Sequence, residues 1–408
     1  MKIIHTSDWH LGQKFLHRDR ADEHQLALDW LCELIREEKA DVLLVAGDIF
    51  DIGNPPNYAR RMYYDFLISL AETSCRRIVI TGGNHDSPSM LEAPAELLAR
   101  LHVHVRGAAR ENLEEELIPL HNEQGELEAV IAAVPFLRDR DLRTSMAGET
   151  GLERIERIRE GLREHYRQVG ILAEAAYAKA GVPLIAMGHL YASGADVSGK
   201  QDNIYIGDKE NIRVQDFPAC FNYVALGHIH RQQAIGGQEH VRYSGSLIPL
   251  SFSETKDDKG VLVLTFSGRE LTSITPRLVP ELRRLKTVQG TLSEVEERLQ
   301  HFAAKGDRGL ASWLEVLVEG NEVPPRLDLH IQELVEDMPL EVLKIRLLRE
   351  RNHTRSSDEA PPELEDLAVE EVFSRRCVAA GLSEADQKTM EETFRELLNW
   401  QQDQDEQA

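Results

Sequence analysis

The sequence predicts an α/β fold in which a two-sheet β-sandwich is flanked by helices, followed by a small α+β domain and C-terminal helices. Two observations predict the sandwich: short apolar runs that end at glycine, and helical patterns between them. Runs of four or five apolar residues, such as residues 42–46, are typical of buried strands. Leu26, Trp30 and Leu34 recur at helical spacing after the first run.

Residues 1–275 form the first predicted domain. Apolar segments at residues 241–243 and 261–266 indicate strands that close a second sheet. The segment 150–180 is charged and has a helical pattern, so we expect it to be a helical insertion on the surface.

The second predicted domain spans residues 276–350. It begins at Pro276 and Pro280, which bracket a change in the sequence pattern. Its pattern is that of a small α+β unit. The expected elements are a strand at residues 313–318, a helix at 327–338 and a strand at 341–348.

The third part, residues 351–408, comprises a polar linker at residues 351–362 and two amphipathic helical segments. Ser383 and Asp386 form a capping-box pattern before the second segment. The apolar positions are Leu364, Leu367, Val372 and Phe373 on the first, and Met390, Phe394, Leu397 and Leu398 on the second. Helices this short cannot bury such stripes alone, so we expect them either to dock on a partner or to fold back on their own domain.

Five polar motifs each follow directly on an apolar run. They are Asp8-x-His10, Gly47-Asp48, Gly83-Asn84-His85-Asp86, Gly188-His189 and Gly227-His228-x-His230. In layered α/β folds, the loops at the carboxyl ends of neighbouring strands converge on one site. We therefore expect these side chains to lie together.

The residue types in these motifs are those of metal ligands. The expected ligands are Asp8, His10, Asp48, Asn84, His189, His228 and His230. Seven ligands are too many for one ion but suit two ions that share a carboxylate, for which Asp48 is the natural bridge. Imidazoles mixed with carboxylates and an amide favour Mn²⁺, Zn²⁺ or Fe²⁺ over Ca²⁺. Two such ions about 3.5–4 Å apart clamp a phosphate and activate water, which predicts phosphoester cleavage.

His85 lies next to a ligand and is expected to be catalytic, facing the substrate instead of the metals. There it would either stabilise the pentavalent phosphorus or protonate the leaving oxygen. Asp86 is expected to act with it by orienting His85 through a hydrogen bond. We leave His24, His102 and His104 out of the site, because a helix and an exposed strand face account for them.

The motifs lie within longer strings that are informative. The strings are His-Thr-Ser-Asp-Trp-His-Leu-Gly at residues 5–12, Ala-Gly-Asp-Ile-Phe-Asp at 46–51, Leu-Gly-His-Ile-His at 226–230, Tyr-Ser-Gly-Ser at 243–246 and Pro-Leu-Ser-Phe at 249–252. They resemble the calcineurin-like metallophosphoesterases and, within them, the SbcD family of nuclease subunits. The resemblance is strong over roughly the first 275 residues and holds for the remainder by layout.

The resemblance implies how the ligands divide between the metals. Asp8, His10, Asp48 and His230 would hold one metal, and Asp48, Asn84, His189 and His228 the other. His85 takes the catalytic role that is not a ligand. Archaeal and eukaryotic relatives carry a second catalytic histidine shortly after the Gly-Asp motif, where this chain has Asp51. A role for that histidine in choosing between exonuclease and endonuclease action is therefore not carried over.

The resemblance also implies activity and partners. It implies a DNA exonuclease and endonuclease that cleaves double-stranded ends and hairpins with two Mn²⁺, for which Mg²⁺ is the expected substitute. The implied partner is an SbcC-type coiled-coil ATPase, which binds ATP itself and docks on the C-terminal helices. This chain would form a homodimer within a heterotetramer, and residues 276–350 look like the capping domain that helps hold DNA.

The formal net charge of −23 is unusual for a protein that binds nucleic acid. Bound divalent cations would offset part of it at the site. Two stretches are locally basic, Arg283-Arg284-x-Lys286 and Lys344-x-Arg346-x-x-Arg349-x-Arg351. They are expected either to contact DNA or to form a solvated face, and a partner that supplies most of the DNA affinity would also resolve the conflict.

Composition points to a soluble, cytoplasmic protein, and the resemblance implies that it is nucleoid-associated. No run approaches the roughly 20 apolar residues of a membrane span, and the N-terminus has no apolar signal segment. The cysteines Cys32, Cys75, Cys220 and Cys377 lack metal or redox spacing and are expected to be reduced.

Two other functional classes remain open. A protein phosphatase or a cyclic-nucleotide phosphodiesterase would use a similar ligand set. Protein phosphatases of the superfamily typically have Asp-Arg-Gly after the second motif and Glu at the end of the third. Here Asp51 is followed by Ile52 and Gly53, and the third motif ends at Asp86. A scaffold without activity would be expected to have lost ligands, and all seven are present.

Overall fold

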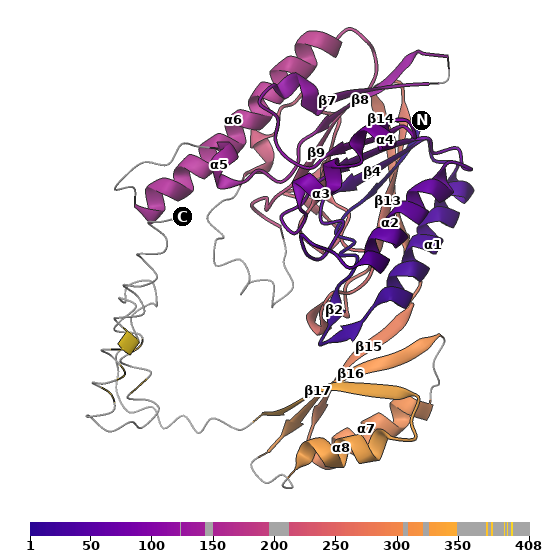
Figure 1. Ribbon diagram of the computed structural model, residues 1–408, viewed down its shortest axis with the longest axis vertical. Coiled ribbons are helices and arrows are strands. Elements are labelled where there is room, and N and C mark those ends of the chain that lie inside the picture. Colours follow the sequence, from indigo (N-terminus) through magenta and orange to yellow (C-terminus); the bar gives the residue numbers. More distant parts are fainter. Residues whose placement is uncertain are drawn as a thin grey trace. The chain divides into compact units, whose positions relative to one another are not determined.

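The computed structural model describes residues 1–122, 124–142, 150–195, 212–304, 309–320 and 326–348, together with six single residues between 373 and 394. It divides into two compact units, Met1–Glu350 and Arg351–Ala408, each described by itself. The predicted two-sheet α/β sandwich flanked by helices is confirmed in the first unit (Figure 1).

The first six-stranded sheet has the order β14-β13-β1-β4-β5-β6. Its strands are β1 (Lys2–Thr6), β4 (Val42–Ala46), β5 (Arg77–Thr81), β6 (Val103–Arg106), β13 (Gly260–Ser267) and β14 (Glu270–Leu278). β1, β4, β5 and β6 are parallel, and β13 is antiparallel to β1. The expectation that residues 261–266 close the second sheet was therefore wrong, because this strand pairs with β1 of the first sheet. Every residue of β4 is buried, since strands of a parallel sheet are covered on both faces and therefore have continuous apolar sequences.

The second six-stranded sheet has the order β11-β12-β10-β9-β8-β7. Its strands are β7 (Leu117–His121), β8 (Leu127–Ala133), β9 (Leu184–His189), β10 (Tyr223–Gly227), β11 (Gln233–Ile235) and β12 (Gln238–Tyr243). β8, β9, β10 and β12 are parallel, and antiparallel strands complete both edges. The carboxyl ends of β9 and β10 thus lie side by side.

The inner faces of the two sheets pack on each other. Side chains such as Ile3, Leu44 and Val79 from the first sheet meet Ile131 and Met187 from the second in one buried cluster. Such face-to-face packing keeps the two sheets at a fixed separation. Loops at corresponding ends of both sheets can therefore contribute to one site.

Helices cover the outer face of the first sheet. They are α1 (Ala21–Glu38), α2 (Asn57–Leu70), α3 (Pro88–Glu92) and α4 (Ala95–Ala99). Leu31 and Ile35 of α1 are fully buried in the cluster beneath. The first helix was predicted, but Leu26 is not part of its apolar face, because its side chain is 42% exposed.

Residues 150–180 were expected to be a helical insertion on the surface. The helix is present, but it packs against the second sheet, so the prediction was wrong in part. Helix α6 (Gly151–Tyr177) begins with a capping box between Thr150 and Glu153. Ile158, Leu162 and Tyr166 are buried among residues of the second sheet. These apolar residues recur every four positions on one helical face, although charged residues dominate the composition. Helix α5 (Asp139–Leu142) precedes α6.

The third sheet has three parallel strands in the order β15-β16-β17. These are β15 (Arg283–Gly290), β16 (Leu310–Glu319) and β17 (Leu340–Leu348), joined through α7 (Leu292–Ala304) and α8 (Leu327–Val335). Both helices lie on one face of this sheet (Figure 1). β16, α8 and β17 were predicted, whereas β15 and α7 were not. The expected boundaries at residues 275 and 350 remain predictions.

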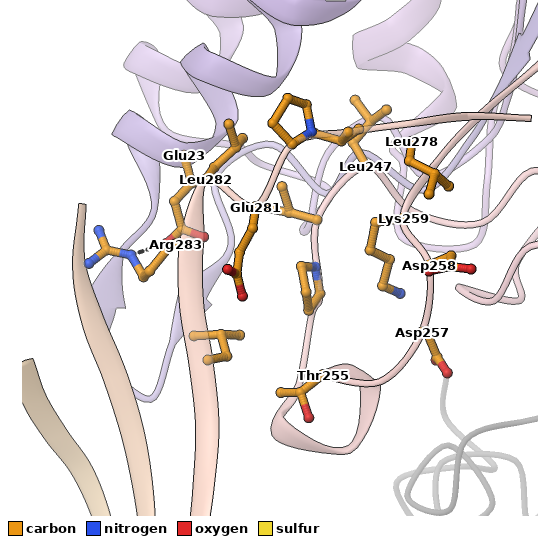
Figure 2. Close-up of a pocket in the computed structure, with 15 residues that line it drawn as sticks. Glu23, Leu247, Thr255, Asp257, Asp258, Lys259, Leu278, Glu281, Leu282 and Arg283 are labelled. Carbon is orange, nitrogen blue, oxygen red and sulfur yellow. Dashed lines mark hydrogen bonds and ion pairs between the residues drawn. The ribbon is translucent and has the colours of Figure 1, made fainter. Parts of the chain in front are cut away.

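A buried charge cluster joins the third sheet to the sandwich. Glu23 of α1 accepts a hydrogen bond from Nε of Arg283 at 2.7 Å and also pairs with Arg20. The guanidinium of Arg283 lies 3.9 Å from the ring centroid of Trp313, which stacks on Phe15 of the β2 (Lys14–Phe15) and β3 (Arg18–Asp19) hairpin. Figure 2 shows the Glu23–Arg283 contact beside a cavity of about 180 Å³.

Short 3-10 helices complete the first unit. They are η1 (Leu113–Glu116), η3 (Val214–Asp216) and η4 (Phe252–Glu254). All four cysteines are free thiols, as expected.

The second unit is described at six residues, Phe373, Cys377, Gln387, Met390, Thr393 and Phe394, all of which are helical. The rings of Phe373 and Phe394 stack, with centroids 4.0 Å apart and planes 4° from parallel. Met390 is 46% exposed. The other predicted apolar positions, Leu364, Leu367, Val372, Leu397 and Leu398, lie outside the described residues.

Candidate metal centre

The predicted ligands lie on loops at the carboxyl ends of five strands. Asp8 and His10 follow β1, Asp48 follows β4, Asn84 follows β5, His189 ends β9, and His228 and His230 follow β10. Because these strands belong to both sheets, the site forms where the two sheets meet. The structure brings all seven side chains into this one region.

The backbone at four of these residues is in the left-handed region, which non-glycine residues rarely adopt. The φ angles are +53° at Asp8, +47° at His10, +50° at Asp48 and +101° at His228. Each such residue costs on the order of 1–3 kcal/mol, so surrounding contacts must hold it. Backbone hydrogen bonds from Asp8 to Gly47 and from His10 to Asp48, both 3.0 Å, join the loops after β1 and β4.

Most of the predicted ligand atoms form two groups, and a third group brings His10 together with Asp51 and His85. Asp8, His10 and His230 offer atoms within 4.8 Å of one another, and so do Asp48, His189 and His228. The carboxylate of Asp48 lies between the groups: its Oδ2 is 3.5 Å from Nε2 of His10 and 3.2 Å from Nε2 of His189.

Asn84 belongs to the second group. Its Oδ1 lies 3.0 Å from Nε2 of His189 and 3.0 Å from Nδ1 of His228. Its amide oxygen therefore faces the same point as the two imidazoles.

Glycine at position 83 permits the close approach of the loops after β4 and β5. A Cβ at this position would lie 2.1 Å from Oδ1 of Asp48 and 2.3 Å from its backbone nitrogen. Any larger residue would therefore displace the central carboxylate.

His85 lies at the exposed edge of the site, but Asp86 does not orient it. Nδ1 of His85 is 2.7 Å from the backbone carbonyl of Asp51. The Asp86 carboxylate is buried and accepts hydrogen bonds from the backbone nitrogens of Ile49, Phe50 and Gly83 at 2.9–3.1 Å. The expected Asp86–His85 hydrogen bond was therefore wrong, because Asp86 ties the loop after β5 to the loop after β4. Burial and the charge of Asp48 raise the pKa of Asp86 to about 6.

Three further side chains contact the ligands from behind. Oδ1 of Asp51 lies 3.1 Å from Nδ1 of His10. Oε1 of Glu254 lies 3.3 Å from Nδ1 of His230, and Lys259 donates to the carbonyl oxygen of His230 at 2.8 Å. In the sequence, Asp51 was noted only because relatives have a histidine near this position. Glu254 and Lys259 were missed, because no local pattern distinguishes them from charged residues on the surface.

The carboxylates of the site raise the pKa of two of its histidines. Burial alone would lower the pKa of His10, but the hydrogen bond with Asp51 and the charges of Asp48 and Asp8 raise it to about 9. Burial also opposes protonation of His189, whose pKa nevertheless rises to about 9 beside Asp48. Burial would raise the pKa of Asp48, but His189 and His10 hold it below its usual range.

The donor set fits divalent metals. Nε2 of His10 is buried and has no hydrogen-bond partner among the described residues. Leaving such a nitrogen unsatisfied is unfavourable, and coordination would satisfy it. Imidazole, carboxylate and amide donors together suit transition-metal ions with mixed nitrogen and oxygen preference.

The basic stretches lie on β15 and β17 and are partly neutralised. Arg283 pairs with Glu23, and Lys344 pairs with Glu315 at 2.8 Å. Lys286 and Arg346 are exposed, whereas 349 and 351 lie outside the described residues.

Two family models match the chain. The model described as calcineurin-like phosphoesterase matches residues 1–232. A second, described as type 5 capsule protein repressor C-terminal domain, matches residues 281–380. The first match covers every predicted ligand.

Curated relatives match nearly the full length. The chain is 38% identical over 399 residues to the SbcD subunit of the nuclease SbcCD of Escherichia coli (strain K12), covering 98% of each. It is 35% identical to the protein of the same name from Rhodobacter capsulatus, over 89% of this chain and 91% of the relative. The corresponding Bacillus subtilis protein is 31% identical over 81% and 79%. None of the described helices is long and apolar enough to span a membrane.

Proposed function

We propose that this chain, which belongs to the calcineurin-like phosphoesterases and, within them, to the SbcD family, is a DNA exonuclease and endonuclease with a two-metal centre. Family membership makes it a nuclease, a phosphodiester hydrolase that uses divalent metal. The observation that carries the two-metal part is the position of the Asp48 carboxylate between two histidine groups. One carboxylate oxygen facing imidazoles on both sides is the arrangement that a bridging ligand requires.

The proposed ligands divide as the geometry suggests. Asp8, His10, Asp48 and His230 would hold one ion, and Asp48, Asn84, His189 and His228 the other. When bound, paired divalent cations clamp the phosphate and supply a nucleophile from water near neutral pH. The protein holds four of these residues, Asp8, His10, Asp48 and His228, in left-handed backbone conformations, so their geometry is set before the substrate arrives.

His85 is the proposed catalytic residue. Its Nδ1 must carry a proton to donate to the carbonyl of Asp51, which leaves Nε2 for the substrate. The neutral ring therefore presents an acceptor at Nε2, and the protonated ring presents a donor. In the protonated form, His85 would stabilise charge on the phosphorus oxygens or give its proton to the leaving oxygen. Asp86 serves this group indirectly by fixing the loop that carries it.

The proposed ions are two Mn²⁺, with Mg²⁺ as a substitute. The carboxylate and amide oxygens support this choice, because such oxygens suit Mn²⁺, and the imidazole nitrogens count against Ca²⁺. Mg²⁺ prefers oxygen donors and retains water, so it should support lower activity.

The proposed substrate is double-stranded DNA, at its ends and at hairpins. Two cations of the basic stretches are already paired, Arg283 with Glu23 and Lys344 with Glu315, so they are less available to phosphates. Lys286 and Arg346 on the third sheet remain exposed. We therefore propose that this sheet guides DNA weakly and that a partner supplies most of the affinity.

The proposed partner is an SbcC-type coiled-coil ATPase, which would bind ATP itself. The relatives are named as subunits of an SbcCD nuclease. In this chain, residues 351–408 form a separate unit in which Met390 is 46% exposed. An exposed apolar side chain among the described helical residues of this unit favours helix-in-groove docking. We further propose a homodimer of this chain within a heterotetramer.

The decisive experiment compares substrates. Mn²⁺-dependent hydrolysis of an aryl phosphodiester is measured beside cleavage of end-labelled linear duplex and hairpin DNA, each with and without SbcC and ATP. We expect cleavage of both DNAs, enhanced by SbcC and ATP. Hydrolysis of small phosphoesters without any DNA cleavage would instead favour a phosphatase or a cyclic-nucleotide phosphodiesterase.

A second experiment tests docking. Removing residues 358–408 should leave hydrolysis of the aryl phosphodiester intact, because every proposed ligand lies before residue 231, and should abolish capture of SbcC. Phe394→Asp should mimic the deletion, since a charge buried without a partner is costly. Met390→Asp is the sharper variant, because it leaves the Phe373–Phe394 stack in place. Full-strength capture by all three would mean that these helices pack on their own domain.

A further inference from the structure

We infer that Asp51 and Glu254 are positioning residues that orient the two imidazoles of one metal position, that of Asp8, His10 and His230. The inference rests on the proposed two-metal function and adds two side chains that are not ligands themselves. Both carboxylates contact the Nδ1 atom of a predicted ligand. Both would therefore direct Nε2 of the same imidazole toward the ion.

Asp51 positions His10. Its Oδ1 lies 3.1 Å from Nδ1 of His10, on the side of the ring away from Asp48. A carboxylate here fixes the tautomer with hydrogen on Nδ1 and a lone pair on Nε2, which is the form that binds metal. Nε2 is the buried atom that has no hydrogen-bond partner among the described residues.

Asp51 also serves the catalytic histidine, but through a different atom. Its backbone carbonyl, not its carboxylate, accepts the hydrogen bond from His85. A side-chain substitution at position 51 therefore removes the contact to His10 and retains the contact to His85. This separation makes Asp51 a clean test position.

Glu254 positions His230 from η4. Its side chain is only 2% exposed, and its Oε1 lies 3.3 Å from Nδ1 of His230. Its Oε2 accepts from the backbone nitrogen of Leu250 at 3.0 Å and from Nζ of Lys259 at 2.7 Å. Lys259 in turn donates to the carbonyl of His230 at 2.8 Å and to Ser246 at 3.0 Å. The Glu254–Lys259 pair thus holds both the ring and the backbone of His230.

The other metal position is built differently. Nδ1 of His189 faces the backbone carbonyl of Ala46 at 2.9 Å. A neutral carbonyl orients an imidazole but adds less to its basicity than a carboxylate does. Substituting Asp51 or Glu254 should therefore weaken one ion position and spare the other.

The test measures Mn²⁺ binding to the full-length chain by calorimetry, with electron paramagnetic resonance of the loaded protein as a second readout. The variants are Asp51→Ala, Asp51→Asn and Glu254→Gln. Asp258→Asn is the control, because this exposed carboxylate lies on the same loop as Glu254. Since Asp51 is 25% exposed, its variants should fold even if removal of the Glu254 charge beside buried Lys259 proves too disruptive.

We expect the wild type to bind two Mn²⁺ that show a spin-coupled spectrum. Asp51→Ala should bind one ion at wild-type affinity and the other about 10- to 100-fold more weakly, with the signal of isolated Mn²⁺ at limiting metal. Asp51→Asn retains an acceptor oxygen and should fall between the two, and Asp258→Asn should match the wild type. Glu254→Gln should resemble Asp51→Asn.

The possible failures are distinct. A wild-type chain that binds only one ion would overturn the two-metal function, and the positioning role with it. A wild type with two ions, together with variants that match it or lose both ions equally, would overturn the positioning role alone.

Discussion

Replacing Gly83 by alanine is expected to disable the metal centre by displacing Asp48. The new Cβ would lie 2.1 Å from Oδ1 and 2.3 Å from the backbone nitrogen of Asp48. Side-chain rotation cannot relieve the second contact, because it is made with the backbone. To reach 3.0 Å, below which real Cβ contacts are essentially never found, the loops after β4 and β5 must separate by about 0.7–0.9 Å.

A displacement of this size is large for a metal centre. Coordination distances hold to within about 0.2 Å, and misplacing a reacting group by about 1 Å costs on the order of 100-fold in rate. We therefore expect Gly83→Ala to hydrolyse an aryl phosphodiester at least about 100-fold more slowly than the wild type. Elemental analysis after loading with Mn²⁺ should find fewer than two ions per chain.

Gly53→Ala provides the matched control near the same site. Its Cβ would lie 3.6 Å from Cβ of Ser87, an ordinary van der Waals distance. This variant should retain wild-type turnover and metal content. Wild-type behaviour of Gly83→Ala, or equal losses in both variants, would refute the steric argument.

Further predictions concern catalysis, stability, DNA and pH. His85→Ala should reduce cleavage by about 10²- to 10⁴-fold with both ions retained, whereas Asp48→Ala should lose metal as well; elemental analysis showing equal metal loss would contradict these roles. Glu23→Gln removes the carboxylate that pairs with the guanidiniums of Arg20 and Arg283. It should lower the free energy of unfolding by about 3–5 kcal/mol, which would be seen as a lower Tm. A loss as small as that from removing a solvent-exposed ion pair would contradict the burial of this contact. The isolated chain should bind duplex DNA weakly, with a shallow dependence on salt in a fluorescence titration, and tight binding would contradict this. Two site histidines have a pKa of about 9 without metal, so Mn²⁺ must displace protons from them below that pH. The affinity for Mn²⁺ should therefore rise with pH up to about 9. Calorimetry that shows no such rise would count against the ligand assignment.

The sandwich was predictable because its signals are local. The run at residues 42–46 is apolar throughout, and β4 is buried throughout. Gly47 follows with a φ of +82°, which supplies the turn that ends the strand. The ligand types could be read at the same positions, since a strand end is where a short polar motif reaches a shared site.

Other features could not be read because they depend on contacts between distant segments. Glu254 lies 24 residues beyond His230, and only the packing of η4 against the loop after β10 brings them together. Asp86 was misassigned for a related reason. It is adjacent to His85 in the chain, yet its carboxylate turns toward the backbone of another loop. The buried stripe of α6 was likewise hidden by the charged residues around it.

The sequence by itself indicated the strands that lead to the five motifs, the residue types at their ends and the family to which the chain belongs. The tertiary structure alone decided that Asp48 lies between two imidazole groups, that Asp51 and Glu254 lie behind the histidines, and that Arg283 is consumed by Glu23. The physical reason is the separation along the chain over which each signal acts. Apolar period and residue type are properties of neighbouring residues, whereas the partner of a charge or hydrogen bond depends on which loops the packing of two sheets brings within about 3 Å.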